Sequence, residues 1–259
     1  MAYSLITGAS GGIGWAIAKE LAARKHDILL LARSEDKLKQ NAEELHNTFG
    51  VNVDYLSIDL SVPDVAVKVY DWLIQKNYSI DILINNAGYA LWGKLQDLTR
   101  EELNQMMQLN MFTMADFCKV MLPMLQKNTK AYILNVSSTS AYQAVPTMST
   151  YAATKAFVLL FTRGLHLELK GTSVSASCLS PGTTTSGFMD RAKMDALKAT
   201  AEKFTMDPEV VATTAIKGMF AGKAEIIPGA MNWISAKMAE ILPKAIPEGI
   251  SKNIYDIKK

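Results

Sequence analysis

The sequence predicts an α/β fold built on a doubly wound parallel sheet with helices on both faces. Short apolar runs alternate with amphipathic stretches from the first residue to about residue 230. Several of these runs are continuously apolar, which is typical of strands that are covered on both faces. A strand, helix, strand order that repeats this often indicates parallel strands joined by right-handed crossovers.

Six segments have the length and composition of strands, and a shorter one could add a seventh. They are Tyr3–Thr7, Asp27–Ala32, Val51–Ile58, Asp81–Asn85, Tyr132–Val136, Ser173–Ser180 and the shorter Glu225–Pro228. Helical spacing of apolar residues predicts helices over about 13–24, 35–48, 64–77, 99–127, 150–170 and 207–221. The rhythm breaks at 183–206, and at Met231–Ile250 we expect a short helix with an irregular tail.

The composition fits one folded domain over residues 1–259. Apolar residues make up 49% of the chain and charged residues 20%, which excludes a disordered or fibrous protein. The formal net charge of +2 is too near neutral to indicate nucleic acid or an anionic membrane as the partner. No internal repeat, low-complexity tract or linker divides the chain.

Targeting signals and cysteine usage predict a cytoplasmic location. The opening MAYSLITGAS lacks the basic region and long apolar run of a secretory signal. The longest apolar stretch, Met106–Leu125, contains polar and charged residues that exclude a membrane span. Cys118 and Cys178 are too few for a disulfide framework, which favours a reducing compartment, and they show no metal-ligand spacing.

A glycine-rich turn joins the first strand to the first helix. The segment Thr7-Gly-Ala-Ser-Gly-Gly-Ile-Gly14 has glycines at 8, 12 and 14, which let the backbone turn tightly and approach a pyrophosphate. The helix N-terminus offers free N–H groups and a partial positive charge to phosphates. A plain tight turn would explain the glycines alone, but their place after the first strand favours a dinucleotide site.

The end of the second strand predicts which dinucleotide binds. An acidic side chain there would bond the adenosine ribose 2′-hydroxyl and repel a 2′-phosphate. This chain has Ala32-Arg33-Ser34, and a guanidinium suits a phosphate. We therefore expect NADP(H) to be preferred over NAD(H); the alternative is a solvated arginine that opens a helix.

Two more strand ends carry polar residues. Asp59-Leu60 follows the third strand, and Asn85-Asn-Ala-Gly88 closes the fourth. Because ligands of open parallel sheets lie beyond the carboxyl ends of the strands, both segments are placed to line a cofactor. An Asx turn or a helix cap would explain either one separately.

The reactive candidates are Ser138, after the fifth strand, and Tyr151 with Lys155 in the next long helix. A spacing of four residues puts Tyr151 and Lys155 on one helix face, about 6 Å apart along the axis. A neighbouring ammonium favours phenolate and lowers the pKa of a tyrosine. Such a pair can move a proton to or from a carbinol oxygen that Ser138 holds.

These motifs resemble the short-chain dehydrogenase/reductase (SDR) family in its single-domain form. Agreement runs in order along the chain through Thr7-Gly8-xxx-Gly12-x-Gly14, Asp59-Leu60, Asn85-Asn86-Ala87-Gly88, Asn110, Ser138, Tyr151-xxx-Lys155 and Pro181-Gly182. The resemblance implies a Rossmann-type sheet of about seven strands and an oxidoreductase that transfers hydride between NADP(H) and a carbonyl or alcohol substrate. Ala141 and Thr184 depart from the commonest family pattern, which affects loop geometry only.

The resemblance also assigns roles to individual residues. Asn110 matches a fourth catalytic residue beside Ser138, Tyr151 and Lys155; in the family it kinks its helix and holds a water that relays protons to the lysine. Pro181-Gly182 and Thr183 would border the nicotinamide, and Thr185 would bond its carboxamide. The expected cofactor residues are Gly8, Ser10, Gly12, Ile13, Gly14, Arg33, Asp59, Leu60, Asn86, Ala87, Gly88, Tyr151, Lys155, Pro181, Gly182, Thr183 and Thr185. No metal is expected.

The family builds its substrate pocket from three segments that are largely apolar in this chain. They include an expected substrate lid at about 183–206 and supply Phe188, Met189, Met194, Phe204, Gln143, Val145, Pro146, Met148, Leu91 and Trp92. This lining suits an apolar ketone, ketoacyl or steroid-like compound, unless the lid methionines only pack on the sheet. A C-terminal tail is expected at about 230–259, and its segment Met231–Ile250 could dock on a membrane or a partner.

The sequence also predicts the oligomeric state and leaves one rival function. The stretches 99–127 and 150–170 are apolar beyond a single stripe, and in the family this pair forms the dimer face, so we expect a homodimer or homotetramer. The rival to an enzyme is a non-catalytic NADP(H)-binding sensor or scaffold. A sensor has no physical need for all four catalytic residues, which argues against that reading.

Overall fold

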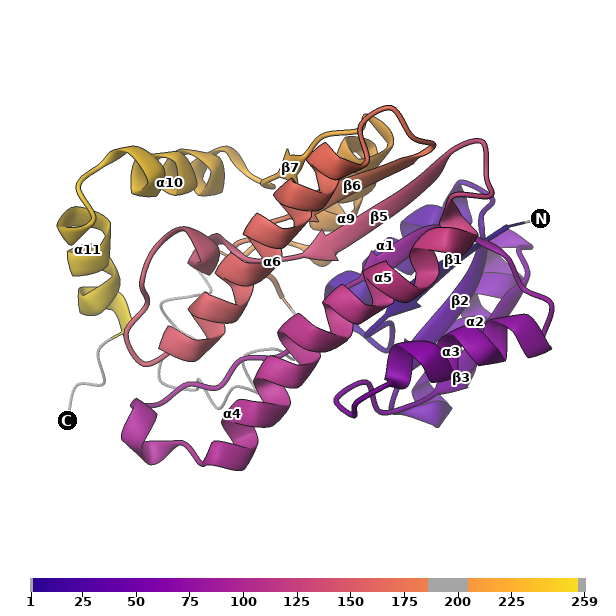
Figure 1. The fold of residues 1–259 in the computed structure, drawn as a ribbon, viewed down its shortest axis with the longest axis horizontal. Coiled ribbons are helices and arrows are strands. Elements are labelled where there is room, and N and C mark those ends of the chain that lie inside the picture. Colours follow the sequence, from indigo (N-terminus) through magenta and orange to yellow (C-terminus); the bar gives the residue numbers. More distant parts are fainter. Residues whose placement is uncertain (1, 186–204, 256–259) are drawn as a thin grey trace.

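The computed structural model describes residues 2–185 and 205–255 (Figure 1). In these ranges the strands form one parallel sheet in the order β3-β2-β1-β4-β5-β6-β7. Their bounds are β1 Tyr3–Thr7, β2 Asp27–Ala32, β3 Val53–Ser57, β4 Ile80–Asn85, β5 Ala131–Val136, β6 Val174–Leu179 and β7 Glu225–Ile226. The predicted doubly wound parallel sheet is confirmed, and β7 is the short strand expected near residue 225.

Helices connect the strands in the predicted order. Their bounds are α1 Gly12–Ala23, α2 Glu35–Phe49, α3 Val65–Gln75, η1 Leu95–Asp97, α4 Arg100–Met107, η2 Gln108–Thr113, α5 Met114–Leu125, η3 Thr139–Tyr142, α6 Ser149–Glu168, α9 Pro208–Phe220, α10 Ala230–Ile241 and α11 Ala245–Tyr255. The stretch 99–127, predicted as one helix, consists of α4, the π-helical turn η2 and α5.

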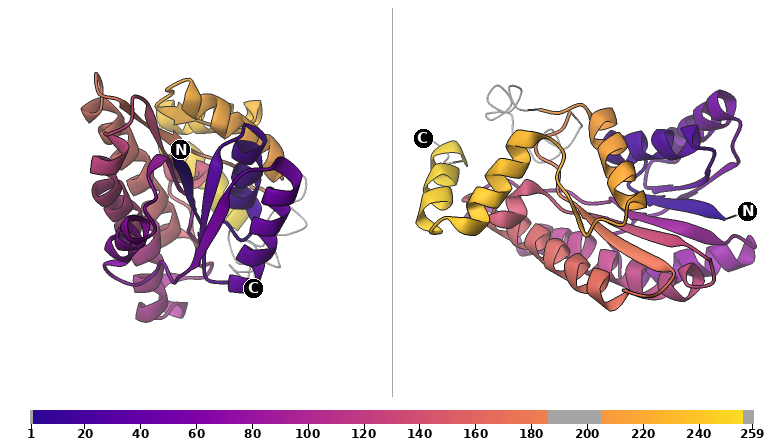
Figure 2. Two further views of the ribbon diagram at one scale, coloured as in Figure 1. Left: turned by 90° about the vertical axis from the view of Figure 1, so that its right-hand side faces the viewer. Right: turned by 90° about the horizontal axis from the view of Figure 1, so that it is seen from above.

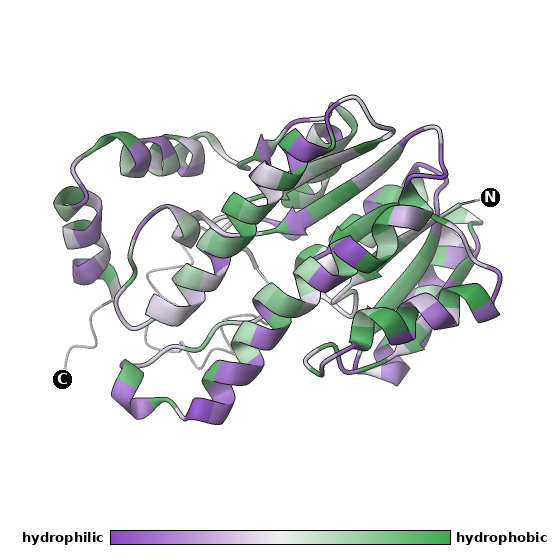
Figure 3. Ribbon diagram, viewed as in Figure 1, coloured by the Kyte–Doolittle hydropathy of each residue, from purple (hydrophilic) through white to green (hydrophobic). Residues whose placement is uncertain are grey.

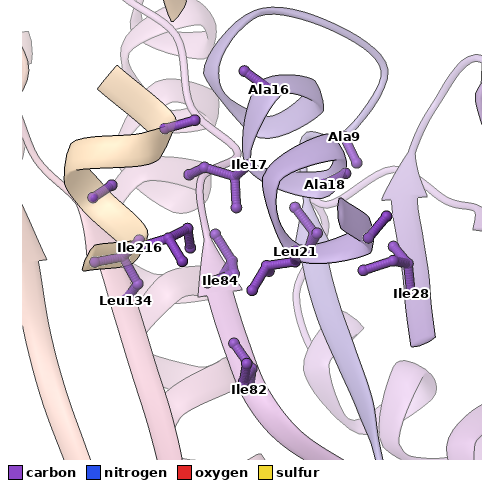
Figure 4. Packing of buried hydrophobic residues seen from close by; sticks show 14 of the residues in the cluster. Ala9, Ala16, Ile17, Ala18, Leu21, Ile28, Ile82, Ile84, Leu134 and Ile216 are labelled. Carbon is purple, nitrogen blue, oxygen red and sulfur yellow. The ribbon is translucent and has the colours of Figure 1, made fainter. Parts of the chain in front are cut away.

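The sheet is buried from both sides (Figure 2). α1, α2 and α9 pack on one face, and α3, α5 and α6 pack on the other. Neighbouring residues of β1 show the reason: Leu5 points to the α5 side and Ile6 to the α1 side, and neither is exposed. Figure 4 shows Ile17 of α1 and Ile216 of α9 against Ile84 of the sheet. Each such side chain stabilises the fold by about 1.5–3 kcal/mol.

Hydropathy follows the same layers. Figure 3 shows the strands in green, whereas α4 at the lower edge is mostly purple. A capping box starts α4: the Thr99 hydroxyl accepts from the Glu102 amide, and the Glu102 carboxylate accepts from the Thr99 amide. A polar helix of two turns is thus held at its first residue as well as by packing.

The strand order reverses between β1 and β4. The chain runs outward from β1 through β2 to β3, then returns to place β4 on the other side of β1. Ligands of such sheets bind at this reversal, beyond the carboxyl ends of the strands. Figure 1 shows α10 and α11 beyond the carboxyl end of β5. The C-terminal helices therefore lie at the same edge of the sheet as the turn after β1.

The expected irregular tail is wrong, because the segment forms two helices, α10 and α11. Pro243 lies in the connection between them. Pro247 falls in the first turn of α11, where an N–H has no helical partner to lose. None of the helices in the described ranges is long and apolar enough to cross a membrane.

Candidate active site

The turn between β1 and α1 has the geometry of an anion site. Gly8 and Gly12 have φ angles of +67° and +56°, the left-handed region that favours glycine. A Cβ on Gly14 would lie 2.5 Å from the Gly8 carbonyl oxygen. No side chain caps the N-terminus of α1, where Gly11 is extended and has open space around it. The first amide groups of α1 are therefore available to a phosphate.

Residues just after β4 hold this turn by hydrogen bonds. The Thr7 hydroxyl accepts from the backbone amides of Asn86 at 2.9 Å and Ala87 at 3.0 Å. The Asn86 side-chain amide donates to the carbonyls of Thr7 at 3.0 Å and Gly8 at 3.1 Å. Asn86 thus shapes the glycine turn, while Asn85 is buried and donates to Asn135 Oδ1 at 2.9 Å. The glycine backbone of the turn and the uncapped amides of α1 are the groups that would hold a pyrophosphate.

Two other expected cofactor residues, Ser10 and Ile13, lie on this turn and in the first turn of α1, where both are half-buried. No sequence motif pointed to Asn41 of α2, which is buried and donates to the Ala9 carbonyl at 3.1 Å. Since Asn41 fixes the peptide directly before Ser10, it belongs to the same turn.

Arg33 and Asp59 follow the carboxyl ends of the paired strands β2 and β3. Arg33 is exposed, and its carbonyl accepts from the Ser57 hydroxyl at 2.9 Å. Hydrogen bonds from Ser61, and less strongly the Arg33 guanidinium, lower the pKa of Asp59. Leu60 is buried, and its carbonyl accepts a hydrogen bond at 2.9 Å from Thr113 of η2. The Arg33 guanidinium is thus exposed just after the end of β2, and the glycine turn adjoins this strand end because the Gly8 amide donates to the Leu31 carbonyl at 2.8 Å.

Lys155 is buried at the carboxyl end of β5. Its ammonium donates to the Val136 carbonyl at 2.8 Å, and the Ser137 hydroxyl donates to the Lys155 carbonyl at 2.6 Å. Burial lowers the pKa of Lys155 to about 8. Its Nζ lies 5.7 Å from the centroid of the Tyr151 ring, so the two side chains share a face of α6 as the spacing predicted. Tyr151 is 6% exposed.

Asn110 lies in η2, where the helix widens to a π-turn, so the backbone is irregular at the position where a kink was expected. Its amide nitrogen donates to the Tyr89 carbonyl at 2.9 Å and to the Thr154 hydroxyl at 3.1 Å, and its oxygen accepts from the Tyr89 amide at 3.2 Å. A Cβ on Gly88 would lie 3.0 Å from this oxygen and 3.4 Å from Lys155 Nζ. Three residues from separate segments thus meet at one point.

The sequence did not indicate Thr154. Its hydroxyl is buried and also donates to the Tyr151 carbonyl at 2.7 Å. Thr154 therefore joins the backbone that carries the tyrosine to the side chain of Asn110.

Ser138 begins the loop after β5. Its hydroxyl accepts from the Ser140 amide at 3.1 Å and caps η3. The amide of Thr139 donates to the Pro181 carbonyl at 3.0 Å. Ser138 therefore lies in a loop that is bonded directly to the Pro181–Gly182 turn after β6.

Four residues expected in the substrate pocket pack in one apolar cluster with Tyr151. They are Leu91, Trp92, Val145 and Met148, together with Ala90 and Met106. Gln143 and Pro146 are half-buried in the loop beside them. Phe188, Met189, Met194 and Phe204 lie outside the described residues, as does most of the expected lid. The two ends of that segment are joined, because Thr185 N donates to the Met206 carbonyl at 3.0 Å and Met206 N to the Thr183 carbonyl at 2.9 Å.

Comparison with known proteins shows the family of this chain. The short chain dehydrogenase family profile matches residues 3–197. Very-long-chain 3-oxoacyl-CoA reductase-A of Danio rerio is 31% identical over 246 residues, which is 92% of this chain and 74% of the relative. The corresponding reductase of Mus musculus is 28% identical over 97% of this chain and 80% of the relative.

Solved structures show the same fold. A short-chain dehydrogenase from Sphingobium yanoikuyae in complex with NADPH has a TM-score of 0.82 at 29% identity, covering 100% of this chain and 97% of the other. The bulky-bulky ketone specific alcohol dehydrogenase of Comamonas testosteroni has a TM-score of 0.77 at 25% identity, with the same coverage. The fold and the strand-edge site define a nucleotide-binding α/β oxidoreductase. This chain belongs to the short-chain dehydrogenase family.

The glycine turn makes a testable claim about space. We predict that Gly14→Ala lowers the free energy of unfolding by about 1–3 kcal/mol, because the new Cβ would collide with the Gly8 carbonyl and the Asn86 amide. Gly11→Ala is the matched control, since nothing lies within 4 Å of its Cβ position. Urea denaturation measures both; equal stabilities of the two variants would contradict the close approach.

The buried ammonium predicts an unusual dependence of stability on pH. The pKa of Lys155 falls from 10.5 to about 8 on folding. Below pH 8 the buried lysine is charged, and its burial lowers the free energy of unfolding by the full amount, roughly 3 kcal/mol. Lys155→Met should therefore raise the free energy of unfolding at pH 7 by up to that amount. Between pH 8 and 10.5 the native lysine loses its proton first, so the wild type gains stability and the difference shrinks.

Denaturation curves at pH 7, 8.5 and 10 without added nucleotide provide the measurement. The exposed Lys127→Met controls for loss of a lysine as such. A Lys155→Met variant that is less stable than the wild type at pH 7 would show that the ammonium stabilises the fold, contrary to this account.

Proposed function

We propose that the chain is an NADPH-dependent carbonyl reductase, or in reverse an alcohol dehydrogenase, with Tyr151 as general acid and base. The observation that carries the proposal is the convergence of Lys155, Asn110 and Gly88 beside Tyr151, at the same sheet edge as the open N-terminus of α1. A sensor needs the nucleotide site alone. It has no use for a buried cation next to a phenol.

Each residue has a task in this reaction. A bound reduced nicotinamide supplies the hydride that reaches the carbonyl carbon. Tyr151 gives its phenolic proton to the carbonyl oxygen, so that the alcohol forms and the phenolate remains. The Ser138 hydroxyl holds that oxygen, and the Lys155 ammonium stabilises the phenolate until a proton returns. Asn110 is hydrogen-bonded to Tyr89 and Thr154, and these bonds hold the π-helical turn η2 in place beside the lysine.

NADP(H) is the preferred cofactor in this proposal. The Arg33 guanidinium is exposed at the end of β2, and the acidic residue that would bond a ribose 2′-hydroxyl is missing there. The NADPH complex of the Sphingobium yanoikuyae relative, at 29% identity, supports this preference.

The substrate is an apolar ketone, with 3-oxoacyl thioesters as the first class to test. The cluster around Tyr151 is apolar and contains two methionines, Met106 and Met148, which adapt to ligand shape. The names of the Danio rerio and Mus musculus relatives point to 3-oxoacyl thioesters, and that of the Comamonas testosteroni relative to bulky ketones.

Exposed Phe112, Phe157 and Leu160 on η2 and α6 support a homodimer or homotetramer.

A substrate screen tests the reaction class directly. NADPH absorbance should fall with long-chain 3-oxoacyl-CoA or bulky ketones, and more slowly with short keto acids, because apolar side chains surround Tyr151 in the part of the chain that the structure describes. The same panel with NADH gives the cofactor preference. No oxidation above background with any carbonyl in the panel would leave only the sensor.

Tyr151→Phe is predicted to lower kcat by at least about 10²-fold, the scale of general acid catalysis, because the donated proton is missing. The dissociation constant for NADPH, measured by fluorescence, should stay close to the wild-type value. Tyr70→Phe on α3 is the control and should keep full turnover. Normal kcat in Tyr151→Phe would contradict the assignment.

Arg33→Ala is predicted to weaken NADPH binding by about 10- to 100-fold, the value of a hydrogen-bonded ion pair to a phosphate. NADH binding should change little, since NADH has no 2′-phosphate. Arg24→Ala is the control, because Arg24 lies at the C-terminus of α1 and is paired with Glu20 of the same helix. Equal losses for both nucleotides would show that Arg33 does not read the phosphate.

A further inference from the structure

A second buried tyrosine lies beside the candidate site. Tyr142 ends η3, four residues after Ser138, and is 7% exposed. Its hydroxyl donates to the Glu225 carboxylate of β7 and is hydrogen-bonded to Ser180 Oγ at 3.1 Å, directly before Pro181. Burial and the carboxylate raise the pKa of Tyr142, so its phenol stays protonated and does not act as the base. The protonated Tyr142 phenol therefore forms a lasting hydrogen bond to the Glu225 carboxylate, which connects η3 to β7.

Glu225 continues this link to the C-terminal helices. Its Oε2 lies 3.4 Å from Lys237 Nζ of α10, and Lys237 also bonds Glu240 at 2.8 Å. The Glu225 side chain is only 18% exposed, and a carboxylate so placed needs partners. Tyr142 also packs with Ala236 of α10 in one apolar cluster. Phenol, carboxylate and ammonium thus tie η3 and β7 to α10.

The same helix touches the turn after β6. A Cβ on Gly182 would lie 2.6 Å from the polar side-chain atoms of Asn232, so α10 rests directly on this glycine. The backbone bond from Thr139 to Pro181 joins the turn to the loop that carries Ser138. Both segments that flank the candidate site therefore rest on α10, at Gly182 and through Tyr142.

We infer that Tyr142 and Glu225, anchored by Lys237, are positioning residues that fix Ser138 relative to the Pro181–Gly182 turn. This inference rests on the proposed function, in which Ser138 holds the carbonyl oxygen and the turn borders the nicotinamide. A shift of about 1 Å in such a group costs up to about 10²-fold in rate. Because β7, which carries Glu225, lies on the other side of β5 from β1 and its glycine turn, loss of the bridge should affect turnover more than nucleotide binding.

Tyr142→Phe tests the bridge, since it removes one oxygen and keeps the ring in its cluster. We expect kcat with 3-oxododecanoyl-CoA to fall by about 10-fold or more, with NADPH affinity within about twofold of the wild type. Amide hydrogen exchange at Thr139, measured without nucleotide or substrate, should be at least about tenfold faster. Tyr132→Phe, which also removes the hydroxyl of a mostly buried tyrosine, at the start of β5, should change neither.

Glu225 separates positioning from a general loss of stability. Glu225→Gln keeps an acceptor for the Tyr142 hydroxyl and should retain most of the wild-type kcat, whereas Glu225→Ala should match Tyr142→Phe. Wild-type kcat or wild-type exchange at Thr139 in Tyr142→Phe would overturn the inference. If the wild type reduces no carbonyl compound, the proposed function fails, and exchange at Thr139 still decides whether the bridge holds the loop.

Discussion

The candidate site depends on the burial of one ammonium group. Lys155 is 5% exposed, and in the part of the chain that the structure describes no carboxylate forms an ion pair with it. A carbonyl oxygen of β5 is its hydrogen-bond acceptor. A cation in such surroundings costs stability. Under the proposed function the protein keeps it because the same low dielectric strengthens its effect on the neighbouring phenol.

The sheet supplies the rigidity that this cost requires. Every residue of β2 and β5 is buried, and their side chains alternate between two apolar layers. At the carboxyl edge a buried polar chain runs from Asn85 of β4 to Asn135 of β5 at 2.9 Å, and on to Thr162 of α6 at 3.0 Å. β4 leads to Gly88, β5 leads to Ser138, and α6 carries Tyr151. Their relative positions are therefore fixed by both packing and hydrogen bonds.

Local patterns in the sequence were enough for the fold and for much of the site. Continuous apolar runs predicted strands buried on two faces, and the four-residue spacing predicted that Tyr151 and Lys155 share a helix face. Contacts between distant residues left no such pattern. Tyr142 and Glu225 are 83 positions apart, and neither stands in a motif. The sequence predicted one short C-terminal helix, and the second, α11, was missed because prolines and a glycine near it suggested irregular backbone, although the first turn of a helix accepts proline.

The protonation of Lys155 tests the central claim most directly. In protein labelled with ¹⁵N and ¹³C at lysine, the Lys155 side-chain resonance can be assigned by its disappearance in Lys155→Met and then followed from pH 6 to 11. This account predicts a midpoint near 8, well below those of the exposed lysines. A midpoint at or above 10.5 would show that the ammonium is solvated or paired with an acid, and the site as described would be wrong.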